Sequence, residues 1–394
     1  MSIRLAQRLL RVRPSPTVGI TALAQRLREA GRDVVVLSVG EPDFATPEHV
    51  KAAARDALAR NDTKYTAVDG TRQLKEAVVA KFKRDNGLDY TPEQVLISNG
   101  AKQSCYNACL ALLDPGDEAI IPAPYWVSYP DMVLLADAEP VIVLSTAESG
   151  FRISAAQLAA AITPKTRLVI LNSPCNPTGA VYSRADLRAF GAVLRAHPQI
   201  VVLTDDIYEH IYWGDEPFAS FAQVCPDLYD RTITVNGMSK AYAMSGWRLG
   251  YAAGPPAVIK AMTSIQSQST TNASTISQAA ARAALVGDQA CVRAMCSEFR
   301  QRHDFVLERL NRIAGFRSIA ASGTFYLFPN IEGAMRIKRI TTDVEFCEQL
   351  LEGAGVALVP GSAFGAPGHL RLSFAASVET LASALTRLER FMAA

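Results

Sequence analysis

A lysine and an arginine lie in the segment that joins two apolar runs, 232–235 and 249–253, and both could do chemistry there. Lys240 is flanked by small and apolar residues. Such surroundings partly desolvate a lysine, which lowers the pKa of its amine and makes it nucleophilic. Arg248 stands at the start of the second run, where a guanidinium could clamp a phosphate with two hydrogen bonds. A solvated lysine and a surface-covering arginine are the structural alternatives.

Further polar residues follow two earlier apolar runs. Asp205 comes just after 200–203, and Tyr208 lies three residues later, so a helical turn would put both on one face. Asn176 lies in a loop after 168–171 that two prolines stiffen, and such a loop can hold an amide rigidly. A helix-capping aspartate, a buried tyrosine and a structural turn are the alternatives.

A glycine turn also suits a phosphate. Gly100 lies between the apolar run 95–98 and a helix-patterned stretch at 105–113. A glycine at a strand-to-helix turn leaves backbone N–H groups free at the positive end of the helix dipole. A tight turn with an ordinary helix cap would explain the same residues.

Seven short apolar runs must position these residues, and they alternate with longer helix-patterned stretches. This alternation is typical of βαβ units, and runs that are apolar throughout indicate strands covered on both faces. Ligands bind at the carboxyl ends of such strands, so the lysine, carboxylate, phenol, amide, glycine turn and arginine are predicted to form one pyridoxal phosphate (PLP) pocket. The runs are 95–98, 119–122, 141–144, 168–171, 200–203, 232–235 and 249–253.

The chain length of 394 residues suggests two or three domains, at about 100–200 residues each. After about residue 285 the pattern becomes mixed helical and strand-like, with a strand predicted at 356–359. Another strand-like run lies near the N-terminus at 34–39. The predicted division is an N-terminal segment, 1–45, that packs with the small domain, a large PLP-binding α/β domain, 46–285, and a small C-terminal α+β domain, 286–394.

Composition excludes several classes of protein. The 49% of hydrophobic residues indicates an ordered globular chain. With 40 Lys+Arg against 38 Asp+Glu the net charge is +2, so no overall field attracts nucleic acid or an anionic membrane. No secretory signal and no apolar stretch of about 18 residues is visible. The seven cysteines form no C-x-x-C pair and the five histidines are dispersed, so we expect a cytoplasmic protein without a metal site.

Ten segments of the sequence resemble the fold-type I, class I aminotransferases, specifically the bacterial aspartate aminotransferase subgroup, over nearly the full length. The resemblance implies the PLP-dependent transferase fold of type I, in which a large domain with a seven-stranded mostly parallel sheet carries a smaller α+β domain. The segments are SVGEPDFATPEHV (38–50), TKYTAVDG (63–70), SNGAKQS (98–104), PYWVSYP (124–130), NSPCNPTGAVY (172–182), TDDIYEH (204–210), VNGMSKAYAMSGWRLGYAAGP (235–255), SGTFY (322–326), VPGSAFG (359–365) and HLRLSFA (369–375).

The resemblance implies a role for each residue around the PLP ring. Lys240 would bind the cofactor covalently through an imine. Asp205 would pair with the pyridine nitrogen and keep it protonated, so that the ring accepts electrons. Tyr208 and Asn176 would hydrogen-bond the phenolic oxygen, and Trp126 would stack on the ring.

The phosphate of PLP would lie against the backbone of Ala101 and Lys102, with Arg248 as its cationic clamp and Ser239 beside it. Tyr65 resembles the tyrosine that reaches the PLP phosphate of a neighbouring subunit. The resemblance therefore implies a homodimer with active sites at the interface.

The substrate residues implied by the resemblance are Arg371, which would grip the α-carboxylate, with Gly40, Asn176 and Trp126 beside it. Lys240, once freed from the cofactor, would remove the Cα proton. Because Arg371 belongs to the small domain, substrate binding is expected to draw that domain over the site and exclude water.

Substrate choice stays open within the class. The resemblance favours L-aspartate with 2-oxoglutarate, and the alternatives are glutamate with prephenate or another aromatic oxo acid, or alanine. An acidic substrate needs a second cation for its distal carboxylate. Polar residues near Ser15 and Thr17, or the stretch 266–271, are candidates, but neither offers an arginine.

Other functions remain to be weighed against transamination. A PLP-dependent C–S lyase would share Lys240, Asp205 and Asn176. A PLP-binding regulator would need a DNA-binding extension, for which about 30 residues before the first expected strand leave no room. A nicotinamide oxidoreductase is disfavoured because no strand is followed by G-x-G-x-x-G.

Overall fold

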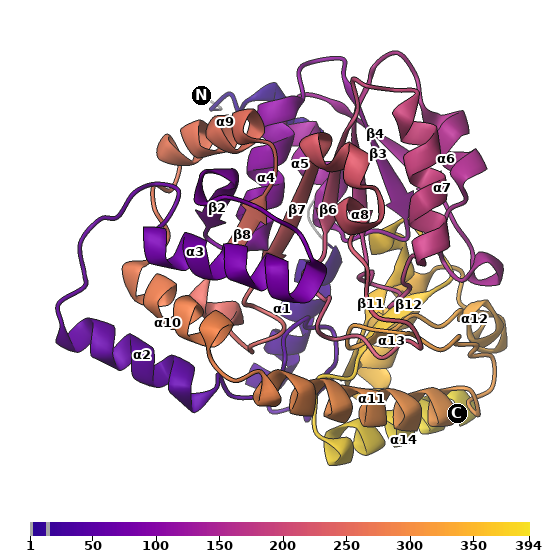
Figure 1. The fold of residues 1–394 in the computed structure, drawn as a ribbon. Coiled ribbons are helices and arrows are strands. Elements are labelled where there is room, and N and C mark those ends of the chain that lie inside the picture. Colours follow the sequence, from indigo (N-terminus) through magenta and orange to yellow (C-terminus); the bar gives the residue numbers. More distant parts are fainter. Residues whose placement is uncertain (1–2, 13–15) are drawn as a thin grey trace.

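The computed structural model describes residues 3–12 and 16–394, and a seven-stranded sheet lies at its centre (Figure 1). The strand order is β2-β8-β7-β6-β5-β3-β4. Strand β8 is antiparallel to β2 and β7, and the other neighbouring pairs are parallel, so the predicted mostly parallel sheet is confirmed. The strands are β2 (Val95–Ser98), β3 (Glu118–Ala123), β4 (Glu139–Leu144), β5 (Thr166–Asn172), β6 (Val201–Asp205), β7 (Thr232–Gly237) and β8 (Gly250–Ala253).

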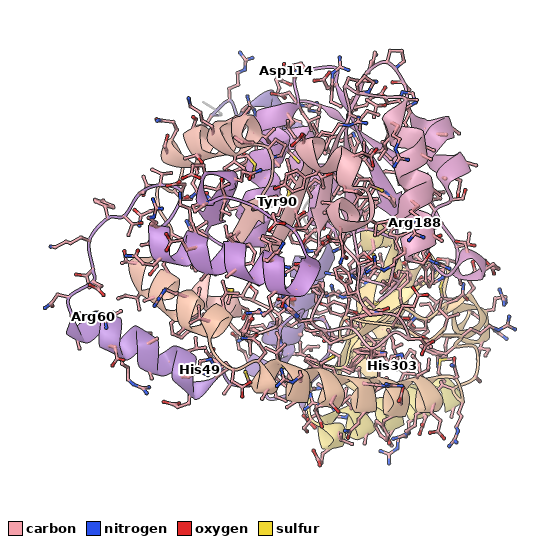
Figure 2. All side chains as sticks on the ribbon, in the orientation of Figure 1. His49, Arg60, Tyr90, Asp114, Arg188 and His303 are labelled. Carbon is pink, nitrogen blue, oxygen red and sulfur yellow. The ribbon has the colours of Figure 1, made fainter. Side chains whose placement is uncertain are left out.

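Helices cover both faces of this sheet, which is why its strands are apolar throughout. Along β5, Leu168 and Ile170 pack with the helices of one face, whereas Val169 and Leu171 pack with those of the other. Tyr90, which Figure 2 labels, belongs to a buried cluster on the latter face, and its ring contacts Phe82 and Tyr229. One face carries α4 (Ala101–Leu112), α5 (Ser128–Leu135) and α9 (Pro256–Ser267); the other carries α2 (Glu48–Ala59), α3 (Arg72–Lys81), α6 (Ala155–Ala161), α7 (Arg184–Arg195), α8 (Phe221–Val224) and α10 (Thr275–Val286).

The C-terminal part of the chain has its own hydrophobic core, and the N-terminal segment contributes to it. Strand β1 (Val35–Val36) pairs in parallel with β10 (Val356–Ala357). A second small sheet has the order β11-β12-β9, with Val359 opposite Arg371 and Ser373 opposite Tyr326. The remaining elements are α1 (Pro16–Glu29), α11 (Ala290–Leu310), β9 (Tyr326–Leu327), α12 (Glu332–Lys338), α13 (Asp343–Ala354), β11 (Val359–Pro360), β12 (Leu370–Ser373) and α14 (Val378–Ala393).

Two predicted strands have other bounds in the structure, and the helical turn considered after Asp205 does not form. The strand expected at 34–39 forms ladder pairs only at Val35 and Val36, after which Leu37 makes single backbone hydrogen bonds with Ala357 and Ser373. The strand expected at 356–359 is divided between β10 and β11, which pair in different sheets. The helical turn considered for Asp205 and Tyr208 is a series of tight turns, in which the amide of residue 209 bonds the carbonyl of residue 206 and the amide of residue 211 bonds that of Tyr208.

Candidate active site

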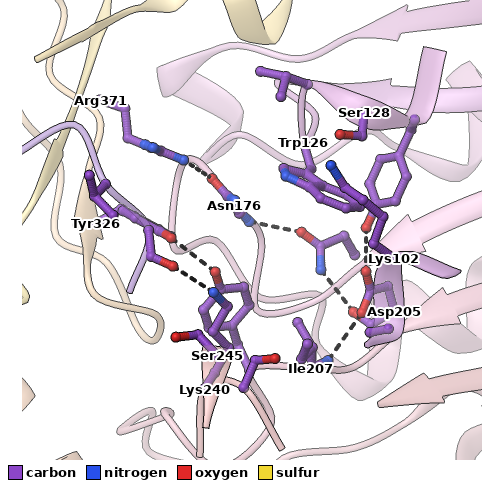
Figure 3. A pocket seen from close by; sticks show the side chains of 18 of the residues that line it. Lys102, Trp126, Ser128, Asn176, Asp205, Ile207, Lys240, Ser245, Tyr326 and Arg371 are labelled. Atoms are coloured by element: carbon purple, nitrogen blue, oxygen red, sulfur yellow. Dashed lines mark hydrogen bonds between the residues drawn. The ribbon is translucent and has the colours of Figure 1, made fainter. Parts of the chain in front are cut away.

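A cavity of about 570 Å³ opens where the carboxyl ends of the parallel strands meet the C-terminal sheet. It brings together all but one of the residues predicted from the sequence, and Figure 3 shows several of them pointing at one another. The predicted residues that line it are Gly40, Ala101, Lys102, Trp126, Asn176, Asp205, Tyr208, Ser239, Lys240, Arg248 and Arg371.

Lys240 lies just beyond β7, and its Nζ donates a hydrogen bond of 2.5 Å to the carbonyl oxygen of Gly40. Burial, followed by the nearby guanidinium of Arg371, lowers the pKa of Lys240 to about 8. A substantial fraction of this amine is therefore neutral near physiological pH, as a nucleophile and a proton acceptor require.

Asp205 is the last residue of β6, and its carboxylate is buried. Tyr129 donates to Oδ2 at 2.7 Å, and the backbone amide of Ile207 donates to Oδ1 at 3.3 Å. Burial raises the pKa of Asp205 to about 6, against the opposing effect of these donors and of Lys240. Tyr129 belongs to the segment 124–130 that carried the resemblance, but sequence reasoning gave it no role.

Arg371 enters the cavity from β12 and is 4% exposed. Its Nη1 donates to Asn176 Oδ1 at 2.9 Å and its Nη2 to the carbonyl oxygen of Ser38 at 2.7 Å, whereas its Nε has no partner in the described structure. Asn172 supports this arrangement, because its side chain accepts from the amide of Asn176 and donates to the carbonyl of Asp205, each at 2.8 Å. Asn172 is a site residue that sequence reasoning missed.

Tyr208 lies in the turn after β6, and its hydroxyl is 3.0 Å from the hydroxyl of Tyr326. Tyr326 comes from β9 and lines the same cavity. The segment 322–326 was part of the resemblance, but no local feature of the sequence indicates that its tyrosine reaches Tyr208.

The opposite end of the cavity is formed by the N-terminus of α4. Two glycines pack closely at this end. A Cβ at Gly250 would lie 2.1 Å from the amide nitrogen of Ala101, and a Cβ at Gly100 would lie 2.6 Å from Nη2 of Arg248. The first N–H groups of a helix have no acceptor within it. Because the glycines carry no side chain that could cover them, these N–H groups form a site that favours an anion, with Arg248 beside it.

Lys102 also faces this end, with its Nζ 4.9 Å from the centre of the Trp126 ring. Burial, followed by the charge of Arg248, lowers the pKa of the Lys102 ammonium. Within the described chain Lys102 forms no ion pair, so its charge is available to a ligand in the cavity.

Tyr65 is the one predicted site residue outside the cavity; it is 91% exposed and lines a separate surface hollow of about 610 Å³. The candidate stretch 266–271 contributes no residue to the active cavity, and Gln266 instead bonds the backbone of Val68 and Ile97. Ser15 and the side chain of Thr17 lie outside the described residues.

One group of potential metal ligands lies behind the site. Asp85, Glu209 and His210 offer ligand atoms within 4.8 Å of one another. The ammonium of the fully buried Lys81 occupies this group by pairing with Glu209 and lying 3.8 Å from Asp85. A protein cation therefore already neutralises these carboxylates.

No helix in the described ranges is long and apolar enough to cross a membrane.

Comparison with known proteins identifies the family. The family model for aminotransferase class I and II matches residues 32–388. The chain belongs to this family. The aminotransferase is 50% identical over 392 residues to the aspartate/prephenate aminotransferase of Nitrosomonas europaea, a match that covers 98% of this chain and 99% of the relative.

Solved structures agree with this assignment. The aminotransferase superposes on an aspartate aminotransferase from Rhizobium meliloti with a TM-score of 0.96 at 48% identity, over 100% of this chain and 99% of the other. An aspartate aminotransferase from Thermus thermophilus with maleate gives a TM-score of 0.92 at 45% identity, over 99% and 100% of the two chains. Transamination and the fold-type I architecture are thereby established.

Class I aminotransferases use PLP, and the cavity fits this cofactor. The buried carboxylate of Asp205 forms no ion pair within the described chain, so a protonated pyridine nitrogen would supply the missing cation. The glycine-lined N-terminus of α4 offers N–H groups to a phosphate. The side chain of Lys240 is partly buried, and its lowered pKa suits a covalent bond to the aldehyde carbon.

Proposed function

We propose that this aminotransferase converts L-aspartate and 2-oxoglutarate to oxaloacetate and L-glutamate. The observation that carries this proposal is a cation in the cavity, besides Arg371, whose side chain the proposed cofactor site does not use. Arg371 and Lys102 both line it, and Figure 3 places them well apart. Arg371 suits the α-carboxylate because its planar fork can hold two oxygens, which leaves Lys102 for the distal carboxylate. Lys102 thus takes the part for which no residue was found in the sequence.

In the proposed cofactor site, each residue that lines the cavity has one role toward PLP. Lys240 holds PLP covalently, Asp205 pairs with the pyridine nitrogen, and Tyr208 and Asn176 bond the phenolic oxygen. Trp126 covers one face of the ring. The phosphate lies against the amides of Ala101 and Lys102, with Arg248 and Ser239 beside them, and Gly40 lines the substrate side.

PLP supplies an electron sink for the pair of electrons left when the Cα proton is removed. Once the substrate amino group has replaced Lys240 on the cofactor, the freed amine would remove this proton, and its lowered pKa of about 8 leaves part of it unprotonated at neutral pH. Asp205 remains ionised beside the pyridine nitrogen, because Tyr129 and the amide of Ile207 donate to it. Arg371 fixes the α-carboxylate and thereby aims the Cα proton at Lys240.

The proposed assembly is a homodimer in which each active site is shared between the two subunits. The proposed location is the cytoplasm. The exposure of Tyr65 supports the proposed homodimer, because the side chain lies outside its own active cavity and is accessible to a second subunit. We also propose the domain boundaries 1–45, 46–285 and 286–394. The separate hydrophobic core of the C-terminal part supports them, and closure of that part would carry Arg371 onto the substrate.

A half-reaction tests this function. L-aspartate is added to the PLP-loaded protein without any oxo acid, while the cofactor spectrum and the released oxaloacetate are followed. Stoichiometric oxaloacetate with loss of the visible band, restored by 2-oxoglutarate, is the expected result. A band unchanged by aspartate would refute the proposed donor. No visible band in the loaded protein would refute the role of Lys240.

Glutamate with prephenate is a second candidate pair, favoured by the name of the Nitrosomonas europaea relative. L-glutamate should react under either pair, because it is also the product of the first, so restoration of the band by prephenate is the result that would indicate the second pair. Alanine and aromatic donors are tested in parallel. Release of ammonia or thiol without an oxo acid would instead indicate a lyase.

A further inference from the structure

We propose that Tyr326 is a positioning residue for transamination, whose hydroxyl directs the phenol of Tyr208 toward the cofactor and whose ring holds the guanidinium of Arg371. The inference rests on the proposed roles of Tyr208 and Arg371. Tyr326 is fully buried and comes from β9, at the side of the cavity opposite the large sheet.

The sheet register places Tyr326 against Arg371. Tyr326 is opposite Ser373 in the β9–β12 pair, and Arg371 lies two residues from Ser373, so Tyr326 and Arg371 are diagonal neighbours on one face. The Cζ atom of Arg371 is 4.5 Å from the centre of the Tyr326 ring and 5.0 Å from that of Phe364. Aromatic rings at these distances attract the guanidinium while its Nη atoms keep their hydrogen bonds.

The hydroxyl of Tyr326 has a distinct task. Burial raises the pKa of both Tyr208 and Tyr326, so both phenols keep their hydrogens at neutral pH. Each hydroxyl has only one hydrogen to donate. If Tyr208 gives its hydrogen to the phenolic oxygen of PLP, its own oxygen must accept, and Tyr326, 3.0 Å away, is placed to donate. A donor behind Tyr208 strengthens the bond that Tyr208 makes.

Gly40 shows how closely Tyr326 is fitted. A Cβ at residue 40 would lie 2.3 Å from the Tyr326 hydroxyl oxygen, so this hydroxyl fits in its present position only beside a glycine. The carbonyl of the same glycine accepts the hydrogen bond from Lys240. Tyr326 therefore contacts Tyr208 and Arg371 directly, and it contacts Lys240 through Gly40.

Two substitutions separate the contacts of the hydroxyl from those of the ring. Tyr326→Phe removes only the hydroxyl, whereas Tyr326→Leu also removes the ring. Tyr90→Phe is the matched control, because Tyr90 is a buried tyrosine on the far side of the sheet that bonds Thr234 at 3.4 Å. Each PLP-loaded variant is titrated with pH in the absence of substrate, to follow the visible band that reports protonation of the Lys240 nitrogen. Calorimetry then measures the affinity for maleate, an unreactive dicarboxylate.

We expect Tyr326→Phe to raise the pH midpoint of the band by about half to one unit, because a weaker donor to the phenolic oxygen favours the protonated nitrogen. Its maleate affinity should stay within about twofold of wild type, because the ring on Arg371 is kept. Tyr326→Leu should show the same midpoint shift and a maleate affinity lowered by about 3- to 30-fold. Tyr90→Phe should change neither quantity.

An unchanged midpoint in Tyr326→Phe would overturn the role of the hydroxyl, and equal maleate affinities in the two variants would overturn that of the ring. Because Tyr326→Phe preserves the packing, it decides the first point even if Tyr326→Leu fails to fold. A wild-type protein without a titrating band refutes the roles of Lys240 and Tyr208, and this inference with them. A wild type that titrates but does not react with aspartate refutes only the proposed substrate, and the midpoint in Tyr326→Phe still decides the role of Tyr326.

Discussion

The buried ion pair between Lys81 and Glu209 should stabilise the turn that carries Tyr208, and a double-mutant cycle can measure its contribution. The two side chains are 0% and 3% exposed. Glu209 accepts further bonds of 2.7 Å from Asn86 and Asn236, so one carboxylate joins α3, the turn after β6 and the end of β7. Removing Lys81 leaves the buried carboxylate without its ammonium partner, and removing Glu209 leaves the ammonium with the more distant Asp85 carboxylate at 3.8 Å.

The expected magnitudes follow from this geometry. Lys81→Met leaves the carboxylate with two amide donors, and Glu209→Gln leaves the ammonium with Asn86 at 2.8 Å and Asp85 at 3.8 Å. Each single variant should lower the free energy of unfolding by about 3–5 kcal/mol. The double variant buries no net charge at this position and should lie within about 1–2 kcal/mol of wild type.

Urea unfolding of the PLP-loaded protein, at one protein concentration, measures the cycle. Lys83→Met is the matched control, because Lys83 pairs with Asp89 at 2.7 Å with both side chains largely exposed; its cost should be at most about 1 kcal/mol. Strictly additive effects of the two single substitutions would refute the coupling.

The same pair predicts how stability depends on pH. Burial alone would raise the pKa of Glu209, but Lys81, His210 and Asn86 outweigh it and hold this pKa below its ordinary value. The stabilisation is therefore fully present above about pH 4.3, the ordinary value for a glutamate, and is lost as the pH falls through the lower folded value. Stability curves of wild type and Glu209→Gln should converge on the acid side, and parallel curves would contradict this account.

Three further predictions concern the active site. Arg371→Ala should raise KM for amino acids by at least about 100-fold and abolish any substrate-induced closure, because two charge-assisted bonds are lost; an unchanged KM would exclude the proposed grip. Lys102→Gln should lower kcat/KM for aspartate by about tenfold and leave that for alanine unchanged, whereas equal losses would show that Lys102 does not select the distal carboxylate. Co-expressed Tyr65→Ala and Lys240→Ala chains should regain about a quarter of wild-type activity, because half of the dimers are hybrids with one native site; no recovery would mean that Tyr65 acts within its own subunit.

The large sheet could be predicted from the sequence because its strands carry a local signal. A strand buried on both faces must be apolar throughout, and the run at 168–171 lies within β5 while the run at 119–122 lies within β3. Polar residues next to these apolar runs predict where the strands end. Asp205 and Lys240 are candidate site residues because they lie at or beyond such ends.

The small strands carry no such signal. Strands β1, β9, β10 and β11 have two residues each. The length of each is determined by its pairing with a distant segment and not by its own sequence pattern. Val35 pairs with Val356 across most of the chain, and no local pattern encodes that contact. For the same reason the contacts of Tyr129 with Asp205 and of Tyr326 with Tyr208 emerge only in the folded structure.

A charged residue inside an apolar run is a local signal for a buried charge, but it does not reveal what that charge does. Arg371 interrupts the strand HLRLSFA, and Lys81 interrupts the helix sequence AVVAKF; both are buried. Lys81 is neutralised by Glu209 and bonded to Asn86, so its charge is used within the fold. Arg371 bonds only neutral oxygens and keeps an unpartnered Nε, although it lies in the same kind of apolar setting. A buried cation without a counter-charge is unfavourable unless a ligand supplies one. The uncompensated charge of Arg371, and not its burial, is therefore what supports its proposed role in binding a substrate carboxylate.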